Sequence, residues 1–222
     1  MFDLSVWPLL ASLRAEESEQ FLALARPRAF ARNEVVCHEG DPADSLHLVE
    51  SGHLAVRGGL ASGATATFTI LSSGDYFGEL ALLREDRRRT ATVIALESSR
   101  TLAVAGSAFD SLCSRNPRVE RVLSALLADR VDALSRRLLE TMYESLDRRI
   151  YGRLVELARS YGVSEGRASI PLSQAHVADL VGATRQSVNQ VLQRLAGRNI
   201  VSLGRGRIEI LDVATLERSC RQ

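Results

Sequence analysis

The order of apolar and polar residues predicts a short helical start and a long β-rich stretch. Residues 4–26 place leucine, alanine and phenylalanine at helical spacing, and Pro27 ends that pattern. From about residue 28 to 110, short alternating or apolar runs are separated by Gly-Asp, Ser-Gly and Gly-Gly turn signals. Several short strands at nearly regular spacing predict an antiparallel sandwich or a barrel-like roll.

A long helix is predicted over residues 117–144. Asn116 is a suitable N-cap, and Pro117 suits the first helical position because its φ is already fixed. Apolar side chains recur at steps of four and three, at Leu123, Leu127, Val131, Leu134, Leu138 and Met142. At ~1.5 Å per residue the helix is about 42 Å long, more than a small domain needs. We therefore expect the seam to meet a partner helix; the alternative is a core helix lying on the β-domain.

Three helices and a β-hairpin are predicted in the C-terminal part. The helices and their end signals are 148–161 with Gly162, 174–181 with Ser173, and 185–196 with Thr184 and Gly197. The hairpin strands are 200–203 and 207–211. Two short helices joined at Gly182-Ala183 have helix-turn-helix proportions. The chain as a whole is therefore expected to be α+β, with a winged helix-turn-helix at its C-terminal end.

The predicted helix at 185–196 has two contrasting faces. One face is apolar and consists of Val188, Val191, Leu192 and Leu195. The other is polar and free of acids, and consists of Arg185, Gln186, Asn189, Gln190 and Gln193. Arginine, glutamine and asparagine match the hydrogen-bonding edges of guanine and adenine in the major groove, whereas an ordinary surface helix mixes glutamate with its basic residues. This helix is predicted to bind DNA, with Arg205 and Arg207 of the hairpin on phosphates.

The charge distribution favours a polyanionic partner for the C-terminal part. The chain of 222 residues has a net charge of +1, and all 28 of its basic residues are arginine. Residues 1–147 hold 16 arginines and 21 acids, a net charge of −5, and residues 148–222 hold 12 arginines and 6 acids, a net charge of +6. Such asymmetry is typical of nucleic-acid binding, although a chance distribution of surface charge gives the same totals.

Composition also excludes several kinds of chemistry. Without lysine the chain has neither a Gly-Lys-Ser/Thr phosphate loop nor a lysine Schiff base. Three widely spaced cysteines, Cys37, Cys113 and Cys220, are typical of a reducing cytosol. There is no signal-peptide pattern and no apolar run of membrane-spanning length. We expect a soluble cytoplasmic protein with no membrane partner, no enzyme motif and no metal site; His38 beside Cys37 is assigned to ordinary packing.

A candidate anion site lies within residues 74–92. Gly78 lets the backbone approach a ligand closely, and a helical turn at 79–83 would point free N–H groups at an anion. After a loop, Arg89 and Thr90 add a charged fork and a hydroxyl. The carboxylate of Glu79 beside a phosphate binder is explained if it accepts a sugar hydroxyl.

These residues resemble the phosphate-binding cassette of a known family. The cassette runs Phe77-Gly78-Glu79-Leu80-Ala81-Leu82 and continues, ten residues after Glu79, with Arg89-Thr90-Ala91. Residues 181–188, Val-Gly-Ala-Thr-Arg-Gln-Ser-Val, resemble the helix-turn-helix of the same family. The chain thus resembles, over nearly its whole length, the cyclic-AMP receptor protein (catabolite activator)/FNR family of transcription regulators.

The resemblance implies a cyclic-nucleotide site, with cAMP or a related cyclic nucleotide as ligand. That site would consist of Gly78, Glu79, Leu80, Arg89, Thr90, Ala91, Arg130 and Ser135. Glu79 would accept the ribose 2′-hydroxyl and pair with Arg130, while Arg89 would hold the cyclic phosphate. Ser135 would meet the adenine across the dimer. Leu134 stands where the catabolite activator has threonine, which weakens the expected contact with adenine.

A DNA-contacting set is expected in the C-terminal part, from the residues and from the resemblance together. It would consist of Ser173, Thr184, Arg185, Gln186, Asn189, Gln190, Arg205 and Arg207. Arg185 matches the family's guanine-reading arginine, whereas Gln186 replaces a glutamate and Gln190 an arginine. Because glutamate accepts from cytosine N4 and glutamine suits adenine, the operator is expected to depart from the family consensus.

We therefore expect a homodimeric, cAMP-responsive regulator that binds a near-palindromic operator and contacts RNA polymerase. Its parts would be a β-roll at 1–115, a dimerisation helix at 116–147 and a winged helix-turn-helix at 148–222. Ligand binding would shift the population of helix registers and re-space the two recognition helices. The alternatives are a regulator with a vestigial or differently liganded pocket, a nucleotide-processing enzyme, and an arginine-rich protein-interaction module. For the anion site itself the alternative is a solvated arginine-rich loop, to which Arg87 and Arg88 are assigned.

Overall fold

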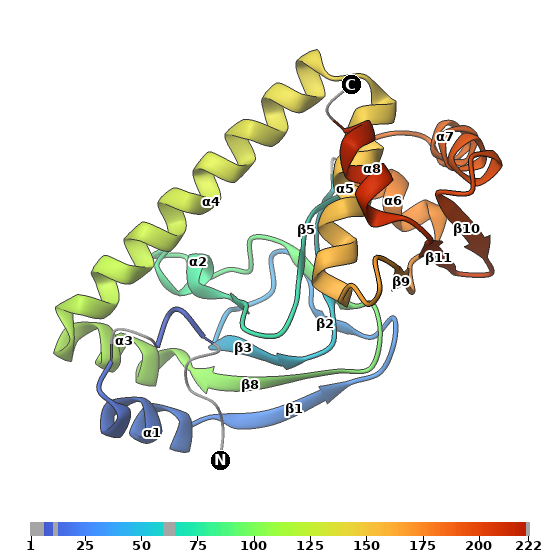
Figure 1. The fold of residues 1–222 in the computed structure, drawn as a ribbon. Coiled ribbons are helices and arrows are strands. Elements are labelled where there is room, and N and C mark those ends of the chain that lie inside the picture. Colours follow the sequence, from blue (N-terminus) through green and yellow to red (C-terminus); the bar gives the residue numbers. More distant parts are fainter. Residues whose placement is uncertain (1–6, 11–12, 60–64, 221–222) are drawn as a thin grey trace. The chain divides into compact units, whose positions relative to one another are not determined.

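The computed structural model describes residues 7–10, 13–59 and 65–220, which form two compact units (Figure 1). The first unit comprises residues 1–63 and 68–133, and the second comprises 64–67 and 134–222. The long helix α4 (Pro117–Tyr143) contributes residues to both. The division of the chain at residues 115 and 147 stays a prediction.

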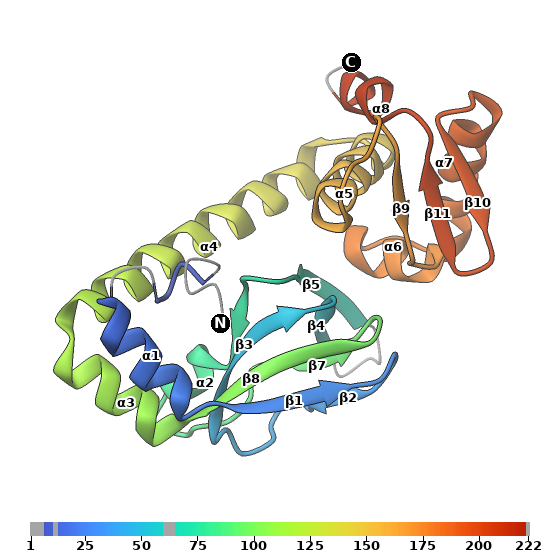
Figure 2. The same cartoon turned by 60° about the horizontal axis from the view of Figure 1, so that its bottom comes forward.

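Two four-stranded sheets build the first unit (Figure 2). Their orders are β1-β8-β3-β6 and β2-β7-β4-β5. The strands are β1 (Arg26–Phe30), β2 (Val35–Cys37), β3 (Ser45–Ser51), β4 (Leu54–Gly59), β5 (Thr65–Leu71), β6 (Tyr76–Phe77), β7 (Thr92–Ala95) and β8 (Ser99–Ala105). The pairs β1–β8, β3–β8, β3–β6, β2–β7 and β4–β7 are antiparallel, as the strand pattern predicts.

The first sheet is buried on both faces. Its inner face meets the second sheet in an apolar core that contains Val49 and Phe77 together with Leu54 and Val93. Its outer face is covered mainly by helical residues; this second core includes Leu46, Leu48, Tyr76, Leu102 and Val104 of the sheet with Phe21, Phe109, Leu112, Val119 and Leu123 of the helices. The helices concerned are α1 (Ala15–Ala23), α3 (Gly106–Arg115) and the first turns of α4.

The helix predicted over residues 4–26 is wrong in its bounds. Among the described residues of this range the helix is Ala15–Ala23, residues 7–10 form a turn-rich segment, and residues 4–6 and 11–12 lie outside the described residues. Pro27 belongs to β1, an edge strand that pairs with β8 alone. An edge strand tolerates proline because one side of it needs no N–H donor.

The long helix is continuous, but the helix that precedes it, α3, was missed. α4 ends at Tyr143, one residue before the predicted end, and Asn116 both terminates α3 and accepts the Val119 N–H through its carbonyl. The next helix, α5 (Leu146–Tyr161), starts two residues earlier than predicted because Ser145 caps it. α3 was not predicted, because its first five residues fall within the stretch of about 28–110 that was expected to form strands.

The second unit has the predicted winged helix-turn-helix order. It contains α5, α6 (Gln174–Val181), α7 (Arg185–Gly197) and the hairpin β10 (Val201–Gly204) and β11 (Arg207–Ile210). Two further elements, β9 (Ala168–Ile170) and α8 (Val213–Ser219), complete it, and β9 extends the hairpin to a three-stranded sheet in the order β10-β11-β9. Gly197 is the last helical residue of α7 rather than its end signal, and Arg198 is the C-cap.

Candidate ligand site and DNA interface

Gly78 lies at the centre of the candidate ligand site, between β6 and the short helix α2 (Glu79–Leu82). Its φ of +99° falls in the left-handed region that favours glycine. A Cβ here would come within 2.8 Å of the Ser45 carbonyl oxygen and would also clash with the Arg89 guanidinium. The glycine therefore allows the arginine to lie directly against the backbone.

Glu79 is a buried carboxylate with a single close cation. Its exposed fraction is 1%, and the Arg130 Nη1 of α4 donates to its Oε1 at 2.5 Å. Burial raises the pKa of Glu79, while the charges of Arg130 and Arg89 oppose that rise. Arg130 also lies over the Tyr76 ring, with its guanidinium carbon 5.5 Å from the ring centroid. The predicted pairing of Glu79 with Arg130 is thus present within the first unit.

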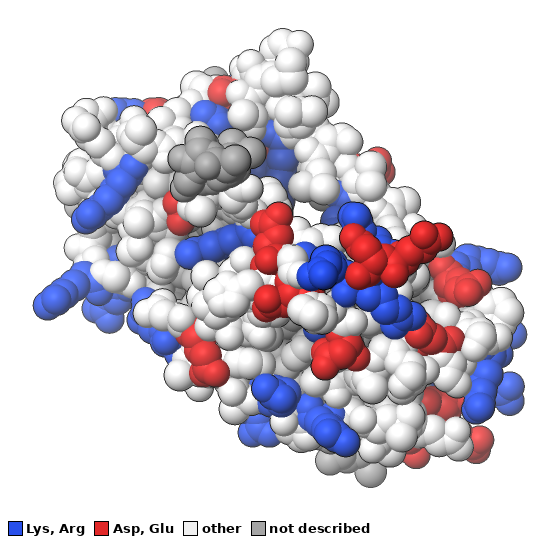
Figure 3. All heavy atoms as spheres, turned by 180° about the vertical axis from the view of Figure 1, so that it is seen from behind, with Lys and Arg blue, Asp and Glu red and all other residues white. Residues whose placement is uncertain are grey.

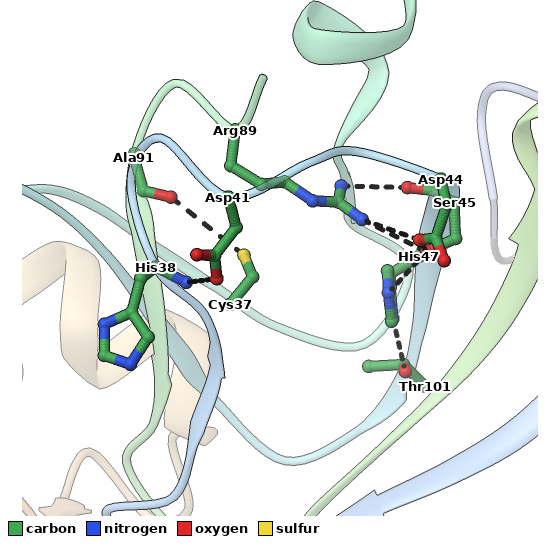
Figure 4. Close-up of polar contacts among 9 residues, drawn as sticks. All are labelled: Cys37, His38, Asp41, Asp44, Ser45, His47, Arg89, Ala91 and Thr101. Carbon is green, nitrogen blue, oxygen red and sulfur yellow. Dashed lines mark hydrogen bonds and ion pairs between the residues drawn. The ribbon is translucent and has the colours of Figure 1, made fainter. Parts of the chain in front are cut away.

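Arg89 is the second buried charge, and Figure 4 shows its guanidinium directed at the start of β3. Its exposed fraction is 7%. Nη1 donates to the Ser45 carbonyl at 2.8 Å and Nη2 to the Ser45 Oγ at 3.1 Å. Its ion-pair partner Asp44 lies 3.7 Å away with a side chain that is 92% exposed. Solvent screens such a pair, so Asp44 compensates little of the arginine's charge.

Backbone bonds hold the segment that carries Arg89. The Arg89 N–H donates to the Asp41 carbonyl at 2.9 Å, and the Gly40 N–H donates to the Arg89 carbonyl at 2.8 Å. The neighbouring arginines are exposed: Arg88 donates to the Gly40 carbonyl, and Arg87 pairs with Asp110. The segment is therefore fixed on both sides, and only one of its three arginines is turned inward.

The other predicted site residues differ in their exposure to solvent. Thr90 and Leu80 are exposed, and Ala91 is buried with its carbonyl 4.0 Å from the Cys37 Sγ. The helical turn ends at Leu82, not at residue 83, and the N–H groups of Leu82 and residue 83 already bond within α2. Ser135 is an exposed residue of α4 in the second unit, so its role as a base contact stays a prediction.

Sequence reasoning missed three residues that surround Arg89 and Arg130. They are Ser45, His47 and Tyr76. One signal was available: Ser45 and His47 alternate with the apolar Leu46 and Leu48, which is the spacing of one strand face. His38 donates its backbone N–H to Asp41. No group of three metal-ligating side chains occurs among the described residues.

The helix-turn-helix is built on two capped helices. The Ser173 Oγ accepts the His176 N–H at the start of α6, and the Thr184 Oγ1 accepts the Ser187 N–H at the start of α7. Gly182 between them has a φ of +63°. Both hydroxyls therefore serve the helix ends, and any contact they make with DNA stays a prediction.

The two faces of α7 divide as predicted. Val188, Val191, Leu192 and Leu195 are its buried residues. Arg185, Gln186 and Gln190 are exposed, and Asn189 is half-buried. In the wing, Arg205 lies in the turn and is exposed, whereas the Arg207 Nε pairs with the Glu209 Oε1 at 3.2 Å. α7 thus carries an exposed polar row, and its contact with base edges stays a prediction.

On the face shown in Figure 3, arginine and acidic side chains lie among one another over much of the surface. The DNA-binding assignment rests on the side chains of α7 and the wing.

Within the described part of the chain, no helix combines the length and apolar composition needed to cross a membrane.

Comparison with known proteins decides the family. Residues 27–116 match the cyclic nucleotide-binding domain, and residues 148–219 match the Crp-like helix-turn-helix domain. The cyclic AMP receptor protein of Thermus thermophilus is 31% identical over 211 residues, which cover 95% of each chain. The chain belongs to the CRP/FNR family of transcription regulators. The predicted family and fold class are confirmed.

Other CRP/FNR relatives agree with this assignment. The CRP-like cAMP-activated global transcriptional regulator of Mycobacterium tuberculosis is 29% identical over 88% of each chain. The Thermus thermophilus catabolite activator protein structure has a TM-score of 0.55 at 29% identity, covering 96% of this chain and 98% of that one. The c-di-GMP-responsive regulator CLP of Xanthomonas campestris has a TM-score of 0.77 at 21% identity, covering 89% and 99%, and shows the fold alone. The family consists of DNA-binding regulators and not of enzymes.

Proposed function

We propose that this protein is a homodimeric transcription regulator whose β-roll binds a cyclic nucleotide, and that this nucleotide is cAMP. The observation that carries the proposal is a buried carboxylate and a buried guanidinium, Glu79 and Arg89, on either side of Gly78. Two opposite charges at 1% and 7% exposure suit a ligand that combines a hydroxyl-bearing sugar with an anionic phosphate.

The charges around Arg89 favour an anionic ligand. The arginine is buried, but its acid partner Asp44 is solvent-exposed and 3.7 Å away. A cyclic phosphate beside the guanidinium would make charge-assisted hydrogen bonds, which are shorter than the 3.7 Å contact with Asp44. Glu79 would accept the ribose hydroxyl while Arg130 keeps it charged. Thr90, Leu80 and the backbone at Gly78 would complete the phosphate contacts.

The exposed side of α4 supports a second copy of this chain as its partner. Large apolar side chains are exposed along this helix, at Val131, Leu134, Leu138, Leu139 and Met142. Their three- and four-residue spacing is that of a helix–helix seam. Removing such an apolar row from contact with water is favourable. A two-fold pairing of α4 would also present two recognition helices to a near-palindromic operator.

Ligand binding would act by population shift. A ligand that contacts the β-roll and α4 together favours the helix register in which both contacts form. The two α7 helices would then be spaced by one turn of DNA, about 34 Å. The bound dimer is expected to recruit RNA polymerase.

Titration of the purified protein with cAMP tests the ligand assignment. Arg89→Ala is expected to weaken binding strongly, because it removes the buried charge that faces the phosphate. Arg88→Ala is the matched control, since Arg88 is an exposed arginine of the same segment whose guanidinium donates to the Gly40 carbonyl. Equal affinities of wild type and Arg89→Ala would overturn the site assignment.

A second candidate function is favoured by Leu134. This exposed leucine cannot donate the hydrogen bond that a threonine would offer to an adenine. The pocket would then be vestigial or take a different effector; the regulator CLP of Xanthomonas campestris, which has the same fold, is c-di-GMP-responsive. Operator affinity measured with no nucleotide, cAMP, cGMP and c-di-GMP separates the two candidates. Equal affinity with and without cAMP would support the second.

Selection of bound fragments from random duplex DNA tests the operator. We expect a near-palindrome whose half-site contains a guanine read by Arg185 and an adenine read by Gln186. Gln186→Glu should shift the preference at that position from adenine towards cytosine. An unchanged preference would contradict the assignment of Gln186 as a base-reading residue.

A further inference from the structure

A row of polar side chains lies on the inner face of the first sheet, among apolar ones. Ser45 and His47 share a face of β3 with Val49, because alternate residues of a strand point to the same side. Val49 and Phe77 belong to the core between the two sheets. His47 is 7% exposed, and Thr101 of β8 is fully buried. Polar groups at such positions need hydrogen-bond partners.

The row forms a continuous chain of contacts that ends at the ligand-site arginine (Figure 4). The His47 Nδ1 lies 3.0 Å from the Thr101 Oγ1, and its Nε2 lies 3.3 Å from the Ser45 Oγ. The imidazole stacks on the Phe77 ring, with centroids 4.7 Å apart and planes 11° apart. The same Ser45 Oγ accepts from the Arg89 Nη2 at 3.1 Å.

The donors and acceptors fix where the protons lie. The Ser45 Oγ donates to the Asp44 Oδ1 at 2.8 Å, because a carboxylate can only accept. The Arg89 guanidinium can only donate, so it uses a lone pair of the Ser45 Oγ. His47 must then carry its hydrogen on Nε2 and donate it to Ser45, which leaves Nδ1 to accept from Thr101.

This assignment requires a neutral imidazole. Burial lowers the pKa of His47 to about 4, and the positive charges of Arg89 and Arg28 lower it in the same direction. Only the carboxylate of Asp44 opposes them. At neutral pH the ring therefore has one N–H and one lone pair, as the chain of contacts needs.

We propose that His47 is a positioning residue for Arg89, which it orients through the Ser45 hydroxyl. The inference rests on the proposed function, since Arg89 is assigned there to the anionic part of the ligand. By donating to Ser45, the imidazole turns an oxygen lone pair towards the guanidinium and holds Arg89 against Gly78. An arginine oriented in advance loses less side-chain freedom when the ligand binds.

Paired histidine substitutions test the proposal through ligand affinity. His47→Phe keeps a ring on Phe77 but removes both nitrogens, and we expect cAMP to bind about three- to tenfold more weakly, the worth of one hydrogen bond. His53→Phe is the matched control, since His53 is 9% exposed and pairs with Glu97 instead. His47→Gln offers an amide donor and acceptor and should restore most of the affinity.

A double-mutant cycle separates positioning from a general structural effect. In an Arg89→Ala background, His47→Phe should cause no further change in residual affinity, because the residue it positions is gone. A wild-type affinity in His47→Phe, or an equal loss with and without Arg89, would overturn the proposal. If His47→Phe fails to fold, Ser45→Ala removes the same hydroxyl link and takes its place in the cycle.

A measurement without ligand keeps this inference distinct from the proposed function. Hydrogen exchange of the Arg89 guanidinium, followed by ¹⁵N NMR and assigned by its loss in Arg89→Ala, should be faster in His47→Phe than in wild type or His53→Phe. Unchanged exchange would overturn the positioning role. Failure of the wild type to bind cAMP would overturn the ligand assignment and leave the exchange result to decide the role of His47.

Discussion

Removal of the Arg130 guanidinium tests how far Glu79 depends on it as a buried counter-charge. Arg130→Met keeps an unbranched stem but loses the 2.5 Å bond to the Glu79 Oε1 and the cation over Tyr76. Glu79 is 1% exposed, and burial already raises its pKa against the opposing charge of Arg130. Without that charge the carboxylate must lie unpaired in the interior or bind a proton.

The expected cost follows from the burial of the two partners. Removing one partner of a fully buried ion pair costs about 3–5 kcal/mol. The Arg130 side chain is 36% exposed, so solvent screens the pair, and we expect a loss of about 2 kcal/mol in the free energy of unfolding near neutral pH. For a chain of this size that corresponds to a fall of about 4–8 °C in Tm.

The pH dependence has a definite sign. Because the pKa of Glu79 is raised in the folded state, that state binds the proton more tightly than the unfolded one, and stability falls as pH rises between the two pKa values. Arg130→Met raises this pKa further. The deficit of the variant should therefore be largest at neutral and alkaline pH and should shrink as acid protonates Glu79.

Urea unfolding near pH 5 and pH 7.5 measures the effect. Arg121→Met, at an exposed arginine of the same helix, is the matched control. Glu79→Gln added to Arg130→Met should remove the pH-dependent part of the loss. The reasoning is refuted if Arg130→Met and Arg121→Met are equally stable, or if the deficit is the same at both pH values.

Three further predictions concern other parts of the chain. Arg185→Ala should weaken operator binding by about 1–3 kcal/mol and relax selectivity at one base, whereas Arg205→Ala should weaken the binding of specific and non-specific DNA equally. Affinities for both kinds of duplex, measured at the same salt concentration, check this. Leu138→Glu should place a charge in the α4 seam and convert a dimer to a monomer in sedimentation; an unchanged mass would argue against pairing through α4. His47 has a pKa lowered from 6.5 to about 4, so wild type should lose stability as pH falls between these values, a dependence that His47→Phe should flatten in acid unfolding curves.

Much of the second unit could be predicted from the sequence because its signals are local. The four apolar residues of α7 are its buried ones, and the caps Ser173 and Thr184 lie at the predicted starts. The helical spacing of 3.6 residues and a capping hydroxyl before the first turn are both visible within about a dozen residues of sequence. The missed strand β9 has only three residues and pairs with β11 forty positions away, so no local pattern marks it.

The ligand site was predicted only in part. Gly78, Glu79 and Arg89 stand in a recognisable motif, and the pairing of Glu79 with Arg130 was implied by resemblance. Ser45, which holds Arg89, lies 44 positions before it, and its contact depends on how β3 is aligned with its neighbours. Strand pairing brings together side chains that lie far apart in the sequence, and no repeating pattern of residues marks which of them will meet.

The sequence by itself determined the winged helix-turn-helix order of the C-terminal part, the two-faced helix predicted at 185–196 and the three residues of the anion motif. These follow from the fixed geometry of helices and turns, which a short stretch of chain expresses alone. The tertiary structure decided which of the three successive arginines, at 87, 88 and 89, is buried, and which neighbours orient it. That choice depends on burial and strand register, because a guanidinium can be removed from water only where folded segments supply its acceptors.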